Sequence, residues 1–492
     1  MNSRVPSQSP VAVIGAGPVG LAAAAHLVQR DLAVIVFEAG ADVADNLGSY
    51  RQVRLFSPWR YNTDRAARKL LTAAGWLAPD DEQLPTAGEL VDGYLQPLAR
   101  TPALAPHIHF GSRVIAVSRD GFDKAKTAGR EHADFLLQVQ TTNGVREVRA
   151  RAVIDASGTW SQPNPLGAHG LPAPGEAEAA ARIAHGMPDI LGADRARYAD
   201  HKVLVVGAGH SAAGSLLALA TLAEQEPGTR LAWAVRGADL RRLFGGGEKD
   251  VLPARGELGT RLRTLVEQGR LEMHLGFGIR EIVVGPEGLR VFAADTTKAP
   301  IEGIDQIIAS TGSRPDLGIA RELRLRLDPW LESTDALAPL IDPNVHSCGT
   351  VRPHGHRELA HPEQGFYAIG AKSYGRAPNF LMATGYEQAR SVVAALAGDL
   401  RAADDVQLEL PETGVCSVDL ASPDLTGGAG ACCGGPATAN ASACCVLDEV
   451  SKAKGDAGCG CGPSDALSTP PAVTQRPEVA RPAALAAVAC CR

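Results

Sequence analysis

The chain has 492 residues, of which 45% are hydrophobic and 21% are charged, and its formal net charge is −7 at pH 7. This length is enough for two or more domains, and a negative charge without a long basic run argues against a nucleic acid or an anionic membrane as partner. The longest apolar stretch, residues 19–37, contains Arg30 and Asp31, so we do not expect it to span a bilayer. The first residues lack the pattern of a signal peptide, and we expect a cytoplasmic protein.

Residues 11–40 have the pattern of a strand, a glycine turn, a helix and a second strand. Gly15, Gly17 and Gly20 form a G-x-G-x-x-G motif at the turn. The first glycine permits the tight turn, the second lets the backbone approach a pyrophosphate, and the third lets helix and strand pack closely. Glu38 ends the second strand, where its carboxylate can accept hydrogen bonds from a ribose. The pattern predicts a dinucleotide-binding unit.

The region from about residue 50 to residue 150 mixes short helices with a hairpin that we expect to turn at Asn143-Gly144. Residues 201–237 then repeat the pattern of strand, glycine turn, helix and strand. Its motif consists of Gly207, Gly209 and Ala212, and alanine is permitted at the third position. Two such units in one chain predict two dinucleotide-binding domains.

The second unit differs from the first where its second strand ends. Arg236 stands there instead of an acid, and Arg241 and Arg242 follow. A guanidinium at this point can pair with a 2′-phosphate, which a carboxylate would repel. The residues therefore favour NADPH over NADH, although arginines in a solvated loop would give the same pattern.

Beyond the second unit, strands resume and a last helix is predicted over residues 384–399. From about residue 401 the composition shifts to Gly, Ala, Pro, Ser and Cys, and little apolar periodicity remains. We therefore expect residues 401–492 to form a largely disordered, low-complexity tail.

At this point the sequence resembles the flavoproteins with two dinucleotide-binding domains, a group that includes thioredoxin reductase, glutathione reductase and the class B flavin monooxygenases. Two Thr/Ser-Gly stretches, around Gly158 and Gly312, look like the crossover motifs that join the domains in this group. The resemblance implies an α/β fold with two Rossmann-type domains, binding FAD and NADPH. The expected boundaries are 10–165 with 301–400 for the FAD domain, 200–300 for an inserted NADPH domain, and 401–492 for the tail.

The position of the cysteines bears on the reaction. Thioredoxin reductase and its relatives pass electrons through a Cys-x-x-Cys or Cys-x4-Cys pair beside the flavin, and neither spacing occurs in residues 1–400. Cys348 stands alone there, and we expect it to be a packing residue. Without a dithiol, dioxygen is the simplest electron acceptor. The resemblance then implies a flavin monooxygenase that oxygenates a small substrate.

The match to class B monooxygenases has departures. In the stretch before the second glycine motif, His185 occupies the histidine place of their signature, but the other signature residues differ. Asn62 lies in a segment that such enzymes place over the flavin, where it could donate a hydrogen bond to a flavin peroxide; a plain loop asparagine is the alternative. After Gly370, Ala371 and Lys372 replace the acid that many relatives use to bind the FAD ribityl chain.

Residues 370–388 also look like the flavoproteins encoded in bacterial arsenic-resistance operons. Thr384 and Glu387 fit a capping box, which predicts that the following helix starts at Thr384. In the family, such a helix points its N-terminus at the flavin, where its dipole would stabilise the anion formed by hydride transfer.

Three histidines, His354, His356 and His361, have the spacing His-x-His-x4-His. Such a cluster could bind a metal ion, but a solvated cationic loop that attracts an oxyanionic substrate is the expected alternative.

Nine of the ten cysteines lie in the last quarter of the chain, mostly as adjacent pairs or Cys-x-Cys. A flexible segment can bring three thiolates around a soft ion, so the tail is a candidate site for trivalent arsenic or another thiophilic metalloid. The candidate ligands are Cys432, Cys433, Cys444, Cys445, Cys459 and Cys461. A low-complexity extension with incidental cysteines is the alternative.

Three functions stay open from the sequence. The first is an FAD- and NADPH-dependent monooxygenase acting on a small substrate, such as an arsenical. The second is a reductase of a metal(loid) or disulfide, in which the vicinal pair Cys490–Cys491 replaces the missing dithiol. The third is a non-catalytic protein that binds soft metalloids through its tail.

Overall fold

The computed structural model describes residues 9–238, 253–344 and 351–408. Arg241, Arg242, Cys348 and all the cysteines of the tail lie outside these residues. The predictions made for them therefore stay predictions.

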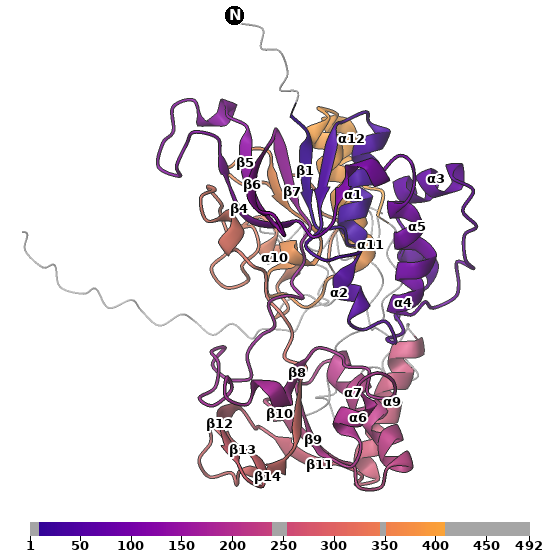
Figure 1. Cartoon of the computed structure of the whole chain (residues 1–492), viewed down its shortest axis with the longest axis vertical. Coiled ribbons are helices and arrows are strands. Elements are labelled where there is room, and N and C mark those ends of the chain that lie inside the picture. The colour runs from indigo at the N-terminus through magenta and orange to yellow at the C-terminus, as the bar shows by residue number, and fades with distance from the viewer. Residues whose placement is uncertain (1–8, 239–252, 345–350, 409–492) are drawn as a thin grey trace, which may run out of the picture. The chain divides into compact units, whose positions relative to one another are not determined.

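The first dinucleotide unit forms a five-stranded sheet in which every pairing is parallel. The strand order places the strand at residues 152–155 beside the first strand (Figure 1), and the last strand of the body pairs with the other side of that strand at the sheet edge. In spatial order the strands are β16 (Phe366–Ala368), β7 (Ala152–Asp155), β1 (Val11–Ile14), β2 (Val34–Phe37) and β3 (Ile108–His109).

The two faces of this sheet are covered by different structures, as the alternation of side chains along a strand requires. Val11 and Val13 of β1 pack in one cluster with residues of α1 (Pro18–Gln29) and α11 (Met382–Leu396). Ala12 and Ile14 pack on the other face against an antiparallel meander. The meander consists of β4 (Arg113–Arg119), β5 (Phe135–Thr141) and β6 (Gly144–Ala150).

The second unit repeats this layered plan with its own parallel sheet. Val203 and Val205 face the helices, whereas Leu204 and Val206 face a three-stranded antiparallel sheet. The parallel strands are, in spatial order, β11 (Glu272–Leu275), β10 (Arg230–Val235), β9 (Lys202–Val206), β15 (Gln306–Ala309) and β8 (Ile183–His185). The helices are α7 (His210–Gln225) and α9 (Pro253–Glu267), and the antiparallel strands are β12 (Ile279–Gly285), β13 (Gly288–Ala293) and β14 (Ile301–Ile304).

Shorter helices fill the connections. Asp64 caps α3 by accepting a hydrogen bond from the Ala67 N–H, and Thr86 and Glu89 form a capping box at α4. The remaining α-helices within the described residues are α2 (Asp45–Gly48), α3 (Arg65–Ala73), α4 (Ala87–Leu90), α5 (Gln96–Ala99), α6 (Arg195–Tyr198), α10 (Ala338–Ile341) and α12 (Leu400–Asp404). A π-helical turn lies at Val91–Leu95, and 3-10 turns lie at Trp59–Tyr61, Ala105–His107, Arg130–His132, Ala180–Arg182, Gly318–Ala320 and Gly370–Tyr374.

Two expected boundaries differ from the structure. Residues 301–309 were assigned to the first domain, but β14 pairs with β13 and β15 pairs with β9 in the second unit. The tail was expected from residue 401, but α12 packs on α11, where Ser391 donates a hydrogen bond to the Ala403 carbonyl. Both differences arise from long-range pairing, which composition alone does not reveal.

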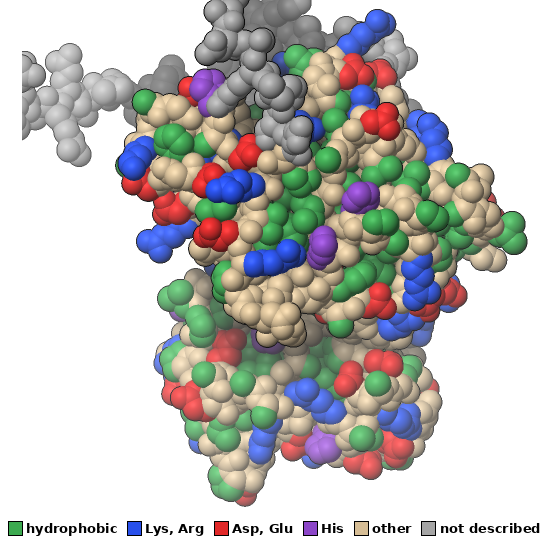
Figure 2. Space-filling model, turned by 45° about the horizontal axis from the view of Figure 1, so that its top comes forward, with side chains coloured by type: hydrophobic (Ala, Val, Ile, Leu, Met, Phe, Trp, Pro, Cys, Tyr) green, Lys and Arg blue, Asp and Glu red, His purple; other side chains and the backbone are tan. Residues whose placement is uncertain are grey.

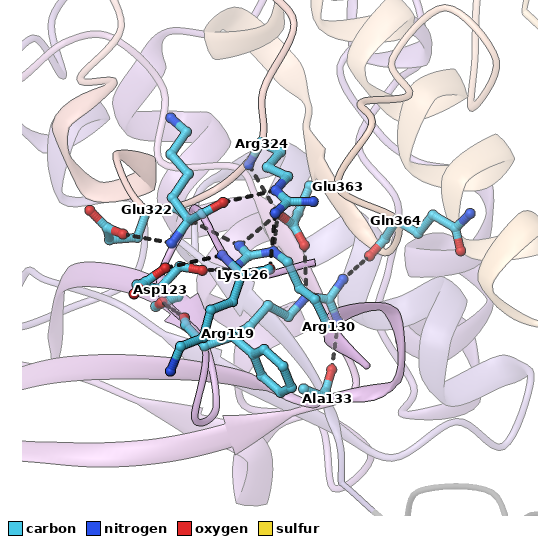
Figure 3. Close-up of polar contacts among 12 residues, drawn as sticks. Arg119, Asp123, Lys126, Arg130, Ala133, Glu322, Arg324, Glu363 and Gln364 are labelled. Atoms are coloured by element: carbon cyan, nitrogen blue, oxygen red, sulfur yellow. Dashed lines mark hydrogen bonds and ion pairs between the residues drawn. The ribbon is translucent and has the colours of Figure 1, made fainter. Parts of the chain in front are cut away.

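A buried ionic cluster ties the meander to the segment before β16 (Figure 3). Arg119 and Arg130 each lie 2.8 Å from a carboxylate oxygen of Glu363, which also accepts the Arg324 N–H. Burial alone would raise the pKa of Glu363, but the hydrogen bonds from these arginines hold that pKa below its usual range. The cluster holds the chain in place three residues before β16 begins.

Acidic and basic side chains are interspersed on the face shown in Figure 2, so that face presents no extended area of one sign. None of the helices in the described ranges is long and apolar enough to cross a membrane.

Candidate cofactor sites

The first glycine turn has the geometry of a nucleotide cradle. Gly15 has a φ of +98°, and a Cβ there would lie 2.8 Å from the Ala156 carbonyl oxygen. A Cβ on Gly20 would lie 2.0 Å from the Gly15 carbonyl oxygen, so this glycine permits the helix to pack against the turn. The space beside Gly17 is open to at least 4 Å. The three glycines therefore have the three different roles that the motif predicts.

The start of α1 and the end of β2 complete this cradle. Among the described residues, no side chain caps the first turn of α1, so its N–H groups are available to a pyrophosphate. Glu38 accepts hydrogen bonds from the Ala16 N–H at 2.7 Å and the Gly40 N–H at 2.8 Å. These contacts fix the carboxylate at the cavity wall, and its remaining lone pairs can accept bonds from a ribose.

A cavity of about 450 Å³ brings most of the predicted FAD residues together. Gly15, Gly17, Glu38, Gly158 and Gly370 all line it. The positive φ of Gly15, the open space at Gly17 and the uncapped helix are features that fit a bound dinucleotide, so the described residues suit FAD.

The second glycine turn repeats the geometry of the first. Gly207 has a φ of +135°, and a Cβ there would lie 2.3 Å from the Ser310 carbonyl oxygen. The space beside Gly209 is open, whereas Ala212 is fully buried where α7 packs on the sheet. Alanine therefore serves at the third position because it is small.

A larger cavity, of about 760 Å³, lies at the second turn. It is lined by Gly207, Gly209, Arg236 and Gly312, so the predicted NADPH residues gather there, and Arg236 is exposed. His185 also lines this cavity, although the monooxygenase signature around it is incomplete. Burial lowers the pKa of His185, which favours its neutral form.

The two crossover stretches lie against each other. Ser313 donates a hydrogen bond to Thr159 at 2.9 Å, and the Asn164 N–H donates to the Gly312 carbonyl at 2.9 Å. Trp160, in the first stretch, lines both cavities. Sequence reasoning did not single out Trp160, and its position beside the crossover glycine is the signal that could have found it.

Gly370 is held by a buried network on α11. Its N–H donates to the Gln388 side-chain oxygen at 2.7 Å, and the Gln388 amide donates to Nε2 of His354 at 2.9 Å. Nδ1 of His354 in turn donates to the Arg352 carbonyl. Burial lowers the pKa of His354, in accord with the neutral ring that this arrangement needs. The network fixes the backbone of Gly370 at the cavity.

Lys372, which lines the same cavity, forms a buried ion pair with Asp155. The Lys372 ammonium lies 2.6 Å from Asp155 Oδ2 and donates to Ser157 Oγ at 3.0 Å. Sequence reasoning noted Lys372 only as a replacement and did not single out Asp155. The signal that could have identified Asp155 is its carboxylate at the end of the otherwise apolar strand "AVID".

The expected role of Asn62 is not supported by its contacts. Its amide hydrogens are donated to the carbonyls of Ser57 and Pro58, at 2.6 and 3.0 Å, and its side-chain oxygen accepts from the Ser57 hydroxyl. Asn62 is also absent from the residues that line the described cavity. The side chain therefore stabilises its own loop, as the alternative of a plain loop asparagine predicts.

The predicted capping box at Thr384 is wrong. The helix α11 begins at Met382, with Leu381 as its N-cap, and Thr384 is buried inside the first turn. Glu387 instead forms an ion pair with Arg390 at 2.7 Å, because the guanidinium is a stronger partner than a backbone N–H. Met382 lines the first cavity, so the helix begins beside that cavity although not at Thr384.

The three histidines do not assemble. His354 bonds to Gln388, His356 lies 2.9 Å from Asp404, and Nδ1 of His361 accepts the Arg326 N–H. Among the described residues, no group of three His, Cys, Asp or Glu side chains could hold a metal ion. The solvated loop was also a wrong expectation, since His354 and His361 are buried.

A family model described as pyridine nucleotide-disulphide oxidoreductase matches residues 12–347, which is more than half of the chain. No curated protein matches.

Solved structures share the fold at low sequence identity. The bacillithiol disulfide reductase YpdA from Bacillus cereus has a TM-score of 0.59 at 19% identity, over 79% of this chain and 99% of that chain. The cadaverine monooxygenase DfoA from Erwinia amylovora, bound to FAD, has a TM-score of 0.56 at 14% identity, over 82% and 97%. The ornithine N-hydroxylase of Kutzneria has a TM-score of 0.55 at 17% identity, over 80% and 99%.

Proposed function

Because this chain belongs to the pyridine nucleotide-disulphide oxidoreductase family, we propose that it is a monooxygenase, which takes hydride from NADPH and uses dioxygen to oxygenate a small substrate. Family and fold make the chain an oxidoreductase whose cofactors are FAD and NADPH. The proposal concerns where the electrons go after they reach the flavin.

The cysteine pattern of the sequence carries the proposal. Neither a Cys-x-x-Cys nor a Cys-x4-Cys pair occurs in residues 1–400, where Cys348 stands alone. A disulfide relay needs a pair of thiols within reach of the flavin. The sequence before the tail supplies no such pair, and this favours dioxygen as the acceptor.

The described residues would divide the work between binding and positioning. Bound FAD would supply hydride acceptance and the subsequent reaction with dioxygen. The first glycine turn and Glu38 would hold its adenosine and diphosphate, and the N-terminus of α11 at Met382 would stabilise negative charge nearby. The second turn would hold the NADPH diphosphate, and Arg236 would pair with the 2′-phosphate.

We assign the substrate as a trivalent arsenical. Support comes from the similarity of residues 370–388 to flavoproteins of arsenic-resistance operons and from the six candidate ligands among the nine tail cysteines, whose thiolates are the soft ligands that a thiophilic metalloid prefers. In this proposal the tail captures the metalloid, either as cargo for the flavin site or to protect the enzyme.

The test measures NADPH oxidation and dioxygen consumption together, with trivalent arsenicals, primary amines and disulfides as substrates. We expect NADPH to reduce the flavin without oxygen, and an arsenical to increase oxygen consumption without a matching rise in hydrogen peroxide. A chain ending at Leu408, which lacks the tail cysteines, is the control for capture by the tail.

The same experiment decides the reductase alternative. Equal turnover of an arsenical or a disulfide with and without oxygen, lost when the tail cysteines are replaced by serine, would establish a reductase and reject the monooxygenase.

A further inference from the structure

The first cavity contains a buried charge arrangement whose purpose the glycine motif does not explain. Lys372 is 4% exposed and belongs to the cavity wall, whereas its partner Asp155 is 0% exposed and is not among the residues that line the cavity. They stand where the sequence lacks the acid that relatives place after the glycine of the last strand, here Gly370. The chain therefore has a cation and an acid where one acid was expected.

Strand pairing explains how the two charges meet. Asp155 is the last residue of β7 and lies opposite Ala368, the last residue of the neighbouring β16. Lys372 follows in the 3-10 turn that starts at Gly370. Both groups thus lie at the carboxyl ends of parallel strands, which is where this class of sheet binds its nucleotide.

The hydrogen bonds within the group leave one donor over. Asp155 Oδ1 accepts the Ser157 N–H at 3.1 Å and the Ser157 hydroxyl at 2.7 Å. The Ser157 oxygen accepts from the Lys372 ammonium, which also faces Asp155 Oδ2. An ammonium has three N–H donors. One is donated to Ser157, and the ion pair with Asp155 Oδ2 can occupy at most one more, so at least one N–H is left over.

A buried ion pair by itself is weak evidence for a role in stability, because desolvation offsets most of the attraction between the charges. Its retention at a cavity wall, with a donor left over, fits a ligand that is rich in oxygen acceptors. We propose that the third N–H of Lys372 binds an oxygen of the ribityl-diphosphate chain of FAD, and that Asp155 and Ser157 position the ammonium for this contact.

The inference rests on the proposed binding of FAD in this cavity, and a competing occupant exists. Asp155 and Lys372 both line a second cavity, of about 20 Å³, together with Thr334. This space is large enough for one water molecule. If the third N–H points to a water there, the pair is structural, and FAD affinity will not depend on it.

The experiment measures the dissociation constant of FAD with the apoprotein. The key variant is Lys372→Met with Asp155→Asn, because it removes both charges together and leaves an oxygen to accept from Ser157. We expect apoprotein melting close to that of the wild type and FAD binding about 10- to 100-fold weaker, as for the loss of a charge-assisted hydrogen bond. Wild-type FAD affinity in this double variant would overturn the inference.

The matched control is a buried ion pair away from the cavity, replaced in the same way as Arg390→Met with Glu387→Gln. We expect this control to change melting but leave FAD affinity within about twofold of the wild type, once binding is measured below the melting range. An equal loss of FAD affinity in both double variants would show a general effect of stability and reject the inference.

A second variant covers the case in which the key variant does not fold. Ser157→Ala keeps both charges and removes one of the contacts that position the ammonium. We expect FAD binding about 3- to 10-fold weaker in this variant, and unchanged binding would contradict the inference. Wild-type protein that does not bind FAD would instead overturn the proposed function, so the two failures are distinguishable.

Discussion

The two glycine turns of this chain are alike in backbone and opposite in charge. Both begin with a glycine at positive φ, Gly15 and Gly207, whose missing Cβ avoids a neighbouring carbonyl. The first is completed by Glu38, fixed by two backbone N–H groups, and the second by the exposed Arg236. The two turns thus share the room that a diphosphate needs and differ in the charge at the next strand end, where we propose that one residue selects the ribose.

The first turn also receives a long-range contribution. Gly370 and Lys372 reach its cavity from the turn after β16, and Asp155 at the end of β7 pairs with Lys372. The second cavity is lined mainly by residues of its own unit and of the crossover stretches. The FAD cavity is thus assembled from both ends of the described chain, which makes it sensitive to changes that the second cavity should tolerate.

The largest expected effect separates the two turns directly. Gly15→Ala should weaken FAD binding by more than about 100-fold, because its Cβ meets the Ala156 carbonyl in a conformation that already strains an alanine. Gly207→Ala should leave FAD bound but slow anaerobic flavin reduction by NADPH to a similar degree. Flavin content and stopped-flow reduction check both, and loss of flavin from the Gly207 variant would contradict the independence of the turns.

Acid should destabilise the protein through the buried His361, whose ring packs against Phe366 of β16. Burial lowers the pKa of His361 to about 4, and the charge of Asp335 opposes this only partly. Because the unfolded histidine binds a proton near pH 6.5, this contribution to stability is complete above about pH 6.5 and is lost as the pH falls toward 4. It amounts to at most about 3 kcal/mol.

Denaturant unfolding between pH 7.5 and pH 4.5 checks this expectation. His361→Asn keeps an acceptor for the Arg326 N–H and should lose less stability over this range than the wild type. His132→Asn is the control, since the His132 side chain is 60% exposed. Parallel pH profiles for the wild type and His361→Asn would contradict the assignment.

The charge difference at the strand ends predicts cofactor choice. Arg236→Ala should raise the KM for NADPH about 10- to 100-fold and leave the KM for NADH nearly unchanged, as expected for one charge-assisted contact worth roughly 1.5–3 kcal/mol. Arg241→Ala and Arg242→Ala serve as comparisons, because they test the neighbouring arginines that the sequence also suggested. Equal losses with both cofactors would argue against a 2′-phosphate contact.

The smallest effect concerns where the catalytic body ends. A chain ending at Leu408 should bind FAD and oxidise NADPH like the full chain. A chain ending at Leu400 should lose roughly 1–2 kcal/mol of stability, because it removes the α12 carbonyls that accept from Arg390 and Ser391. Equal melting temperatures of the two truncated chains would contradict the role of α12.

The sequence by itself determined the features that depend on neighbouring residues. The glycine spacing, the apolar strands and the acid or arginine at the next strand end are all encoded within about thirty residues, so both turns could be predicted. The hairpin turn at Asn143-Gly144 was predicted for the same reason, and β5 and β6 meet there.

Only the tertiary structure decided the features that join distant segments. Asp155 and Lys372 are far apart in sequence and meet because β7 pairs with β16. The helix α11 begins at Met382 and not at Thr384, and Glu387 pairs with Arg390 and accepts the Gln407 N–H, which the fold brings from beyond the helix. A buried charge takes the partner that the fold brings near, since desolvation makes an unpaired charge costly, and no local pattern records which partner that will be.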